Sequence, residues 1–202
     1  MKIEELENCP TWLKNAHTED ADVDIVNGVV HWNSGTWCKG NWWGYVWHRG
    51  IWKSGVWYSG TWHSGTWEGG VWQNGTWCRG VWIKGYWYNG TWHNGFWLNG
   101  TWNMGIWGDG NWHDGTWISG CWEAGNWENG TWHSGNWYGG TWEDGYWLDG
   151  SWSTGTWHNG TWRNGIWYNG VWQNGTWHEG TWGHGKWVKG TWKEGFPTNL
   201  LL

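Results

Sequence analysis

Tryptophan recurs at every fifth position from Trp32 to Trp192, and this period constrains the fold more than any other feature of the chain. A Gly follows three residues after each of these Trp, except where Gly44 comes one place early and Tyr45 takes the expected position. Only Trp12 and Trp43 lie outside the period. The chain has 35 Trp and 38 Gly among its 202 residues. The unit is x-Trp-x-x-Gly, and such a fixed short period is typical of a repeat architecture.

The five-residue period excludes an α-helix. Successive Trp would advance about 140° around a helix of 3.6 residues per turn, so no apolar face would form. The residue before Trp is β-branched in 22 of the 33 units, which favours extended chain. The residue before Gly is often Asn, Asp or Ser, and Asn-Gly or Asp-Gly is a turn dipeptide. Each unit is therefore expected to be a short strand followed by a corner.

Alternation along extended chain predicts which side chains are buried. Gly and the Trp two residues later share one face, and the Thr or Val between them faces the other way. If the Trp side chains faced water, they would form an apolar surface far larger than a soluble monomer tolerates. We therefore expect a Trp core. Its representative members are Trp62, Trp82, Trp107, Trp127, Trp147 and Trp167.

The unit Gly60-Thr61-Trp62-His63-Ser64 resembles the pentapeptide-repeat family, in which a small and a central side chain point inward. The resemblance covers about residues 31–195, with Gly in place of Ala and Trp in place of Leu or Phe. It implies an all-β fold, a right-handed parallel β-solenoid with four five-residue faces per 20-residue coil. About eight coils would then form a rod of about 40 Å at the strand spacing of 4.8 Å. The Trp-Gly version also looks like repeat proteins of large tailed bacteriophages.

The two ends differ from the repeat. Residues 1–30 carry a net charge of −5, and Asp22 to Val26, Asn27-Gly28 and Val29 to Trp32 have the pattern of strand, tight turn and strand. We therefore expect an N-terminal cap (1–30), a solenoid (31–195) and an apolar C-terminal tail (196–202). The irregular Trp42-Trp43-Gly44-Tyr45 predicts a bulge or distorted corner.

Charge and hydropathy exclude several classes. There is no apolar run of eighteen residues and no apolar core near the N-terminus, so we expect no membrane span and no signal peptide. Four Cys without a Cys-x-x-Cys pair fit a protein made in a cytoplasm. This is either the cytoplasm of a host, with later incorporation into a virion, or the cytoplasm of the cell that encodes the protein. Residues 31–104 carry +4 and residues 105–160 carry −7. A nucleic-acid partner is thus unexpected, because no continuous basic surface exists.

Candidate chemistry is sparse. Seven His follow a Trp, and on a 20-residue coil His93, His113 and His133 would stack in one ladder that is a weak candidate for a metal site. We favour a solvated outer face instead, since these ladders lack carboxylate or thiolate ligands. Gly180 to Lys186 matches a phosphate loop only as far as Lys, because Trp187 stands where Ser or Thr must bind magnesium. We expect no cofactor and no enzyme activity.

Three function classes remain. The first is a structural or interaction protein, a rigid rod in a virion or an assembly. The second is a binding module for glycan or protein that uses exposed aromatic or His faces, with Tyr58, Tyr88, Tyr138 and Tyr168 as candidates. The third is a DNA mimic that binds a type II topoisomerase, as some pentapeptide-repeat proteins do.

The C-terminal tail favours self-association. It has four apolar side chains and no charge to cover the last coil, and an open solenoid end exposes strand edges. Family relatives often dimerise at this end, so we expect a homodimer with contacts from Phe196, Leu200, Leu201 and Leu202.

Overall fold

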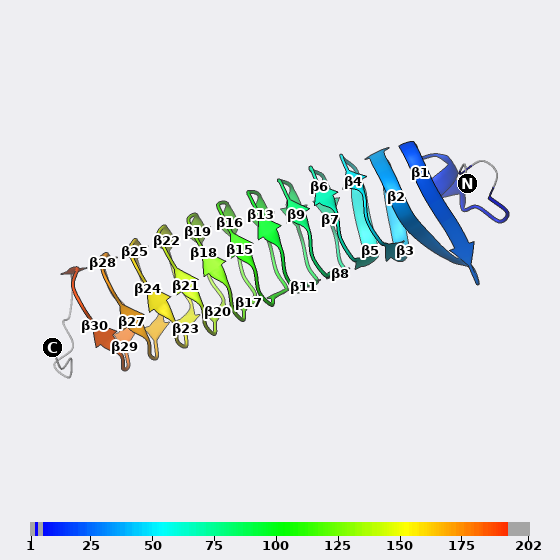
Figure 1. Ribbon diagram of the computed structural model, residues 1–202. Helices are drawn as coiled ribbons and strands as arrows, with labels where there is room; N and C mark the ends of the chain where they lie inside the picture. The colour runs from blue at the N-terminus through cyan, green and yellow to red at the C-terminus, as the bar shows by residue number, and fades with distance from the viewer. Residues whose placement is uncertain (1–2, 4–5, 194–202) are drawn as a thin grey trace.

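The computed structural model describes residue 3 and residues 6–193. It is an elongated parallel β-solenoid of about 11 turns with a regular Trp core, so the expected fold class is confirmed (Figure 1). Four strands have seven or more residues: β1 (His17–Val26), β2 (Val29–Lys39), β3 (Asn41–Trp47) and β5 (Val56–Trp62). One short helix, α1 (Thr11–Lys14), lies at the N-terminal end of the described chain.

Every other strand consists of the Trp of one unit and the residue before it. In chain order these strands are β4 (Ile51–Trp52), β6 (Thr66–Trp67), β7 (Val71–Trp72), β8 (Thr76–Trp77), β9 (Val81–Trp82), β10 (Tyr86–Trp87), β11 (Thr91–Trp92), β12 (Phe96–Trp97), β13 (Thr101–Trp102), β14 (Ile106–Trp107), β15 (Asn111–Trp112), β16 (Thr116–Trp117), β17 (Cys121–Trp122), β18 (Asn126–Trp127), β19 (Thr131–Trp132), β20 (Asn136–Trp137), β21 (Thr141–Trp142), β22 (Tyr146–Trp147), β23 (Ser151–Trp152), β24 (Thr156–Trp157), β25 (Thr161–Trp162), β26 (Ile166–Trp167), β27 (Val171–Trp172), β28 (Thr176–Trp177), β29 (Thr181–Trp182), β30 (Lys186–Trp187) and β31 (Thr191–Trp192).

The coil has three sides and fifteen residues. Thr116 pairs in parallel with Thr101 on one side and with Thr131 on the other, and the same step relates all the regular strands. The amide of Thr116 donates to the carbonyl of Gly100 at 2.9 Å, and each strand repeats this bond one coil back. The expected 20-residue coil with four faces and about eight coils is therefore wrong, although the parallel solenoid itself is right.

The corner glycines explain the narrower coil. Their φ angles run from +112° to +146°, a region that side chains other than Gly rarely adopt. A Cβ on Gly110 would lie 2.4 Å from the carbonyl oxygen of Gly95 in the preceding coil. Three sides need sharper corners than four, and Gly at positive φ supplies them. The unit thus requires Gly for its backbone conformation as well as for its small volume.

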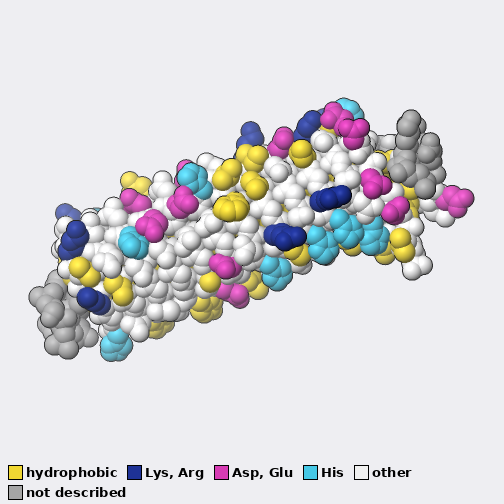
Figure 2. Space-filling view, in the orientation of Figure 1, with side chains coloured by type: hydrophobic (Ala, Val, Ile, Leu, Met, Phe, Trp, Pro, Cys, Tyr) yellow, Lys and Arg dark blue, Asp and Glu magenta, His cyan; other side chains and the backbone are white. Residues whose placement is uncertain are grey.

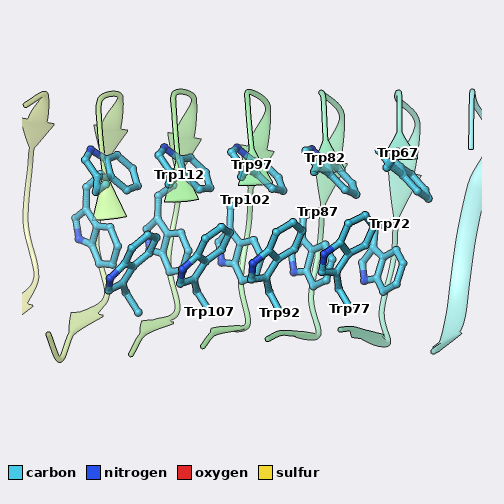
Figure 3. Packing of buried hydrophobic residues seen from close by; sticks show 14 of the residues in the cluster. Trp67, Trp72, Trp77, Trp82, Trp87, Trp92, Trp97, Trp102, Trp107 and Trp112 are labelled. Carbon is cyan, nitrogen blue, oxygen red and sulfur yellow. The ribbon is translucent and has the colours of Figure 1, made fainter. Parts of the chain in front are cut away.

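The core consists of three columns of stacked indole rings (Figure 3). Trp107 stacks on Trp92 and Trp122 with ring centroids 4.8 Å apart and nearly parallel planes. It meets Trp102 and Trp112 of the adjoining sides edge-on, at 5.9 Å. Such offset-stacked and T-shaped pairs are the favoured aromatic geometries. Complete burial is found at all six representative core positions, Trp62, Trp82, Trp107, Trp127, Trp147 and Trp167.

The indole N–H groups are mostly unpartnered within the described residues. The expectation that each of them reaches a backbone carbonyl near a corner is right at two positions and wrong at most others among the described residues. Trp112 does donate to the carbonyl of Asn129 at 3.2 Å, and Trp167 donates to that of His184 at 3.1 Å. Another 28 buried indole nitrogens in the described chain have no hydrogen-bond partner. Their desolvation costs free energy, which ring stacking and burial of the rings must offset.

The irregular third side of the first coil is a bulge, as expected. The pairing of β3 with β5 shifts register between Trp42 and Trp43, and again between Trp43 and Tyr45. Trp42 keeps its place in the core and is fully buried, whereas Trp43 is turned outward and is 46% exposed. The extra residue therefore places an aromatic ring on the outer face without interrupting the core.

At the N-terminal end, β1 pairs antiparallel with β2 through a turn at Asn27 and Gly28, both of positive φ. The expected hairpin is present, and β2 continues from it directly into the first coil. Trp12 of α1 lies against this end of the core, with its ring 5.3 Å from that of Trp42. These residues separate the first indoles from water.

The last described coil is less covered. Trp182 and Trp187 are 8% exposed, whereas the mid-rod Trp side chains are fully buried. The expected contact residues Phe196, Leu200, Leu201 and Leu202 lie outside the described residues. The predicted dimer thus remains a prediction.

Candidate functional site

The fifteen-residue coil sets which outer side chains are neighbours. The residue after each Trp has its amide bonded to the Trp carbonyl one coil back, as in Glu128 N to Trp112 O at 2.8 Å. Side chains fifteen residues apart therefore form columns along the rod, at about the 4.8 Å spacing of paired strands. The candidates His93, His113 and His133 are twenty apart, so they lie on three different sides. The expectation that they form one ladder is wrong.

A different set of imidazoles is brought together near the hairpin. The rings of His31 and His48 lie 5.5 Å apart and those of His48 and His63 lie 5.3 Å apart, all nearly parallel. Nδ1 of His31 is 3.2 Å from Nε2 of His48. We call these three residues the histidine ladder, and Figure 2 shows His side chains in a row on this part of the rod. A period of fifteen in the sequence is the signal that finds the pair His48 and His63.

The surroundings of His48, the middle residue of the histidine ladder, favour its neutral form. Partial burial lowers the pKa of His48, and the positive charges that His63 and His31 would carry lower this pKa further. A neutral imidazole is the form that donates a lone pair to a metal or accepts a proton. Cys78 follows His63 by one coil in the same column, and burial raises the pKa of its thiol.

A second column combines His with carboxylates. Glu128 contacts Nδ1 of His113 one coil away, and Glu143 lies 3.9 Å from Nε2 of His158 in the next pair. These four side chains occupy successive coils and are about half exposed. The sequence argument that the His ladders lack carboxylates is therefore wrong for His113 and His158. Each pair is a surface ion pair when the His is protonated, and such pairs contribute little stability.

The acidic residues next to glycine serve the corners. Asp109, Asp114, Asp144 and Asp149 each accept a hydrogen bond from the amide of the following Gly, at 2.7–2.8 Å. Asn74 does the same for the amide of Gly75. These side chains are thus turn-forming groups, in agreement with the Asn-Gly and Asp-Gly pattern. They account for part of the negative charge of residues 105–160.

An aromatic pair lies on the outer face at the bulge. The ring of Trp43 stacks on that of Tyr58 with centroids 3.7 Å apart. Tyr88 falls two coils beyond Tyr58 on the same side and is 46% exposed. Tyr138 and Tyr168 lie two coils apart on another side, so the four Tyr candidates do not form one surface.

The remaining reactive groups are the four cysteine thiols and the side chains that could bind a metal ion. All four Cys are free, and Cys38 and Cys78 lie on different sides of the fifteen-residue coil. Within the described residues, no group of three or more His, Cys, Asp or Glu is placed to hold a metal ion. Any metal site there would have to use two protein ligands and complete its coordination from solvent.

Comparison with known proteins does not assign the chain to a family. No protein-family model matches the chain, and no curated protein matches it significantly. Among the described residues, no helix is both long enough and apolar enough to cross a bilayer.

Proposed function

We propose that this protein is a non-enzymatic structural or interaction protein whose solenoid serves as a stiff rod. The observation that carries this proposal is the continuity of the Trp core. From Trp32 to Trp177 every Trp of the repeat is fully buried, and each stacks on its equivalent one coil away. Hydrogen bonds join successive coils on all three sides. A rod with such uniform nearest-neighbour contacts resists bending at any single coil.

Membership of the pentapeptide-repeat family is part of this proposal. The five-residue unit with an inward central side chain supports it, and the three-sided coil differs from the four-sided one that the resemblance implies. The likeness to repeat proteins of large tailed bacteriophages suggests a virion or assembly component. Four free thiols are consistent with synthesis in a reducing cytoplasm.

Two measurements test this proposal. Small-angle scattering should give a rod about 50 Å long for eleven coils at the strand spacing, with a constant cross-section. For the virion role, mass spectrometry of purified virions from the proposed phage source should find the chain at a fixed copy number per particle. A chain that is absent from virions and assembly intermediates would contradict the virion role, while scattering from a compact sphere would contradict the rod.

A binding module is the second candidate, and the stacked pair of Trp43 and Tyr58 favours it. The pair is held at the bulge with Trp43 half-exposed, and aromatic faces of this kind stack on sugar rings or bases. A glycan array on the intact protein tests this function, with Trp43→Ala as the variant that should abolish any signal. Signal that survives Trp43→Ala would assign binding to another surface.

The DNA-mimic alternative has less support. Its acidic side chains Glu128 and Glu143 face His113 and His158, and several Asp bond to corner amides. The negative charge lies in two segments, residues 1–30 and 105–160, which the net positive residues 31–104 separate. A gyrase supercoiling assay is the direct test, and we expect no inhibition at micromolar protein.

A further inference from the structure

We propose that His31 and His48 form a two-imidazole site for a late first-row divalent metal ion, such as Zn²⁺ or Cu²⁺, at the hairpin end of the rod. His31 lies on β2 in the first coil, and His48 follows β3 in the second. The amide of His48 donates to the carbonyl of Trp32 at 2.8 Å, which fixes its backbone beside that of His31. Two ligands on adjacent coils are therefore held by the main-chain ladder.

The distance between the two nitrogens matches a metal chelate. Nδ1 of His31 and Nε2 of His48 are 3.2 Å apart. Two imidazole nitrogens about 2.0–2.1 Å from a tetrahedral zinc ion lie about 3.3 Å from each other. An ion between the rings thus needs only small side-chain movements. Neutral His carries one ring proton, so the tautomers with Nε2–H on His31 and Nδ1–H on His48 direct both lone pairs to the ion.

The third residue of the histidine ladder orients the ring of His48. His63 stacks on His48 with an angle of 6° between the planes, which restricts the orientation of the His48 ring.

A negative charge lies on the same outer face. Asp24 of β1 is the cross-strand partner of His31, and directly opposite residues of an antiparallel pair project to the same side. Its carboxylate accepts a hydrogen bond from the side-chain Nδ2 of Asn33 at 2.8 Å. This carboxylate offsets part of the charge that a divalent ion brings to the surface.

Two imidazoles select the metal by its chemistry. They suit zinc, copper and nickel, whereas Mg²⁺ and Ca²⁺ prefer oxygen ligands. Water would complete the coordination. A bound ion would link β2, which continues from the hairpin, to the second coil, and would thereby hold the cap end of the solenoid together.

Isothermal titration of the intact protein with Zn²⁺, and with Mg²⁺ as the control ion, tests the proposal. We compare wild type with His31→Gln, His48→Gln, His63→Gln and His133→Gln at about pH 7.5, above the ordinary His pKa. The His31→Gln and His48→Gln variants should each lose one equivalent of bound Zn²⁺. The His133→Gln variant should bind as wild type does. The His63→Gln variant should retain the site within about tenfold in affinity, as for a residue that only orients a ligand.

Several outcomes would overturn the site. No Zn²⁺ heat in the wild type would do so, as would Mg²⁺ binding of equal strength. An unchanged Zn²⁺ stoichiometry in both His31→Gln and His48→Gln would place the ion elsewhere, for instance on the free thiols. Complete loss in His63→Gln would show that the pair is not the site. Trp emission and thermal melting confirm that each variant is folded, and Zn²⁺ should raise the melting temperature only where His31 and His48 are both present.

Discussion

At the scale of the residue, a corner glycine meets two separate demands. It adopts a φ that other residues avoid, and the carbonyl of the preceding coil occupies the space where a Cβ would be. At Gly140 the φ is +112° and a Cβ would lie 2.3 Å from the carbonyl oxygen of Gly125. Neighbouring Gly139 has no such φ, and a Cβ there would meet nothing closer than 3.6 Å. The two adjacent glycines therefore offer a matched comparison.

We predict that Gly140→Ala destabilises the fold by about 3 kcal/mol or more, because it combines backbone strain with overpacking. Gly139→Ala should change stability by about 0.5 kcal/mol or less, as for most surface substitutions. Denaturant unfolding followed by Trp emission measures both. Equal effects of the two substitutions would contradict the assignment of the corner.

A second prediction concerns the burial of one core Trp. Trp107 is fully buried between two stacked and two edge-on indoles. Trp107→Ala should cost about 3–5 kcal/mol, as other large-to-small core substitutions do. Thr116→Ala, on the outer face of the same coil region, should cost far less. If both variants melted at the same temperature, the inner and outer faces would be reversed.

The burial of the Trp side chains and the position of the corners could be predicted from the sequence. Alternation along extended chain predicts that Trp is buried, and Asn-Gly or Asp-Gly predicts the corner. The exact environment of the indole N–H could not be predicted, because it depends on how coils are offset along the rod. Only Trp112 and Trp167 show the expected bond to a corner carbonyl among the described residues.

At the scale of the coil, the five-residue period does not determine how many sides close a turn. Three and four units both satisfy the alternation, and the choice depends on how sharply each corner bends. The resemblance to the pentapeptide-repeat family implied four sides. Gly in place of Ala permits the positive φ that a sharper corner uses, so this departure from the family pattern was the available signal for three.

Because the expected coil had twenty residues instead of fifteen, the expected neighbours among the outer side chains were also wrong. With twenty residues per coil, His93, His113 and His133 would be adjacent. With fifteen, His48 stacks on His63 and His113 meets Glu128. The residue types could be recognised from the sequence, but their grouping required the number of sides. The contact between His31 and His48 spans seventeen residues, because His31 pairs with Val46 one coil on and His48 lies two residues beyond Val46 on the same outer face.

The lowered pKa of His48 should make stability depend on pH. The pKa of His48 in the folded protein lies below its ordinary value of 6.5, so the unfolded chain binds more protons just below that pH. The contribution of His48 to the free energy of unfolding is therefore complete above about pH 6.5. It is lost as the pH falls through the lower pKa that His48 has in the folded protein. We predict that His48→Gln reduces the fall in melting temperature between pH 7.5 and pH 5.5, both about one unit from 6.5. An identical fall in wild type and variant would contradict this prediction.

At the scale of the whole molecule, the two ends of the rod are unequal. The hairpin and Trp12 cover the first coil, whereas the indoles of the last described coil are slightly exposed. We predict a homodimer formed at the C-terminal end, because two such ends meeting about a two-fold axis would bury both sets of strand edges. Light scattering on the intact chain and on a version that ends at Gly195 measures this. The intact chain should be dimeric and the shortened one monomeric, and a monomeric intact chain at micromolar concentration would rule the dimer out.

The three-sided coil determines the stacking of the core, the columns of outer side chains and the neighbours of each histidine. In a variant with Ala or Ser at the four native Cys positions, His113→Cys with Glu128→Cys places two thiols fifteen residues apart. Their Cα atoms would lie about 4.8 Å apart, within the range of a disulfide. The matched pair is His113→Cys with His133→Cys, twenty residues apart, which a four-sided coil would place next to each other.

Oxidation followed by mass spectrometry of the unfolded, alkylated chain measures whether each pair forms an intramolecular disulfide. The three-sided coil predicts rapid cross-linking of residues 113 and 128, and none of residues 113 and 133. Cross-linking of 113 with 133 in preference to 128 would contradict the fifteen-residue coil and everything built on it.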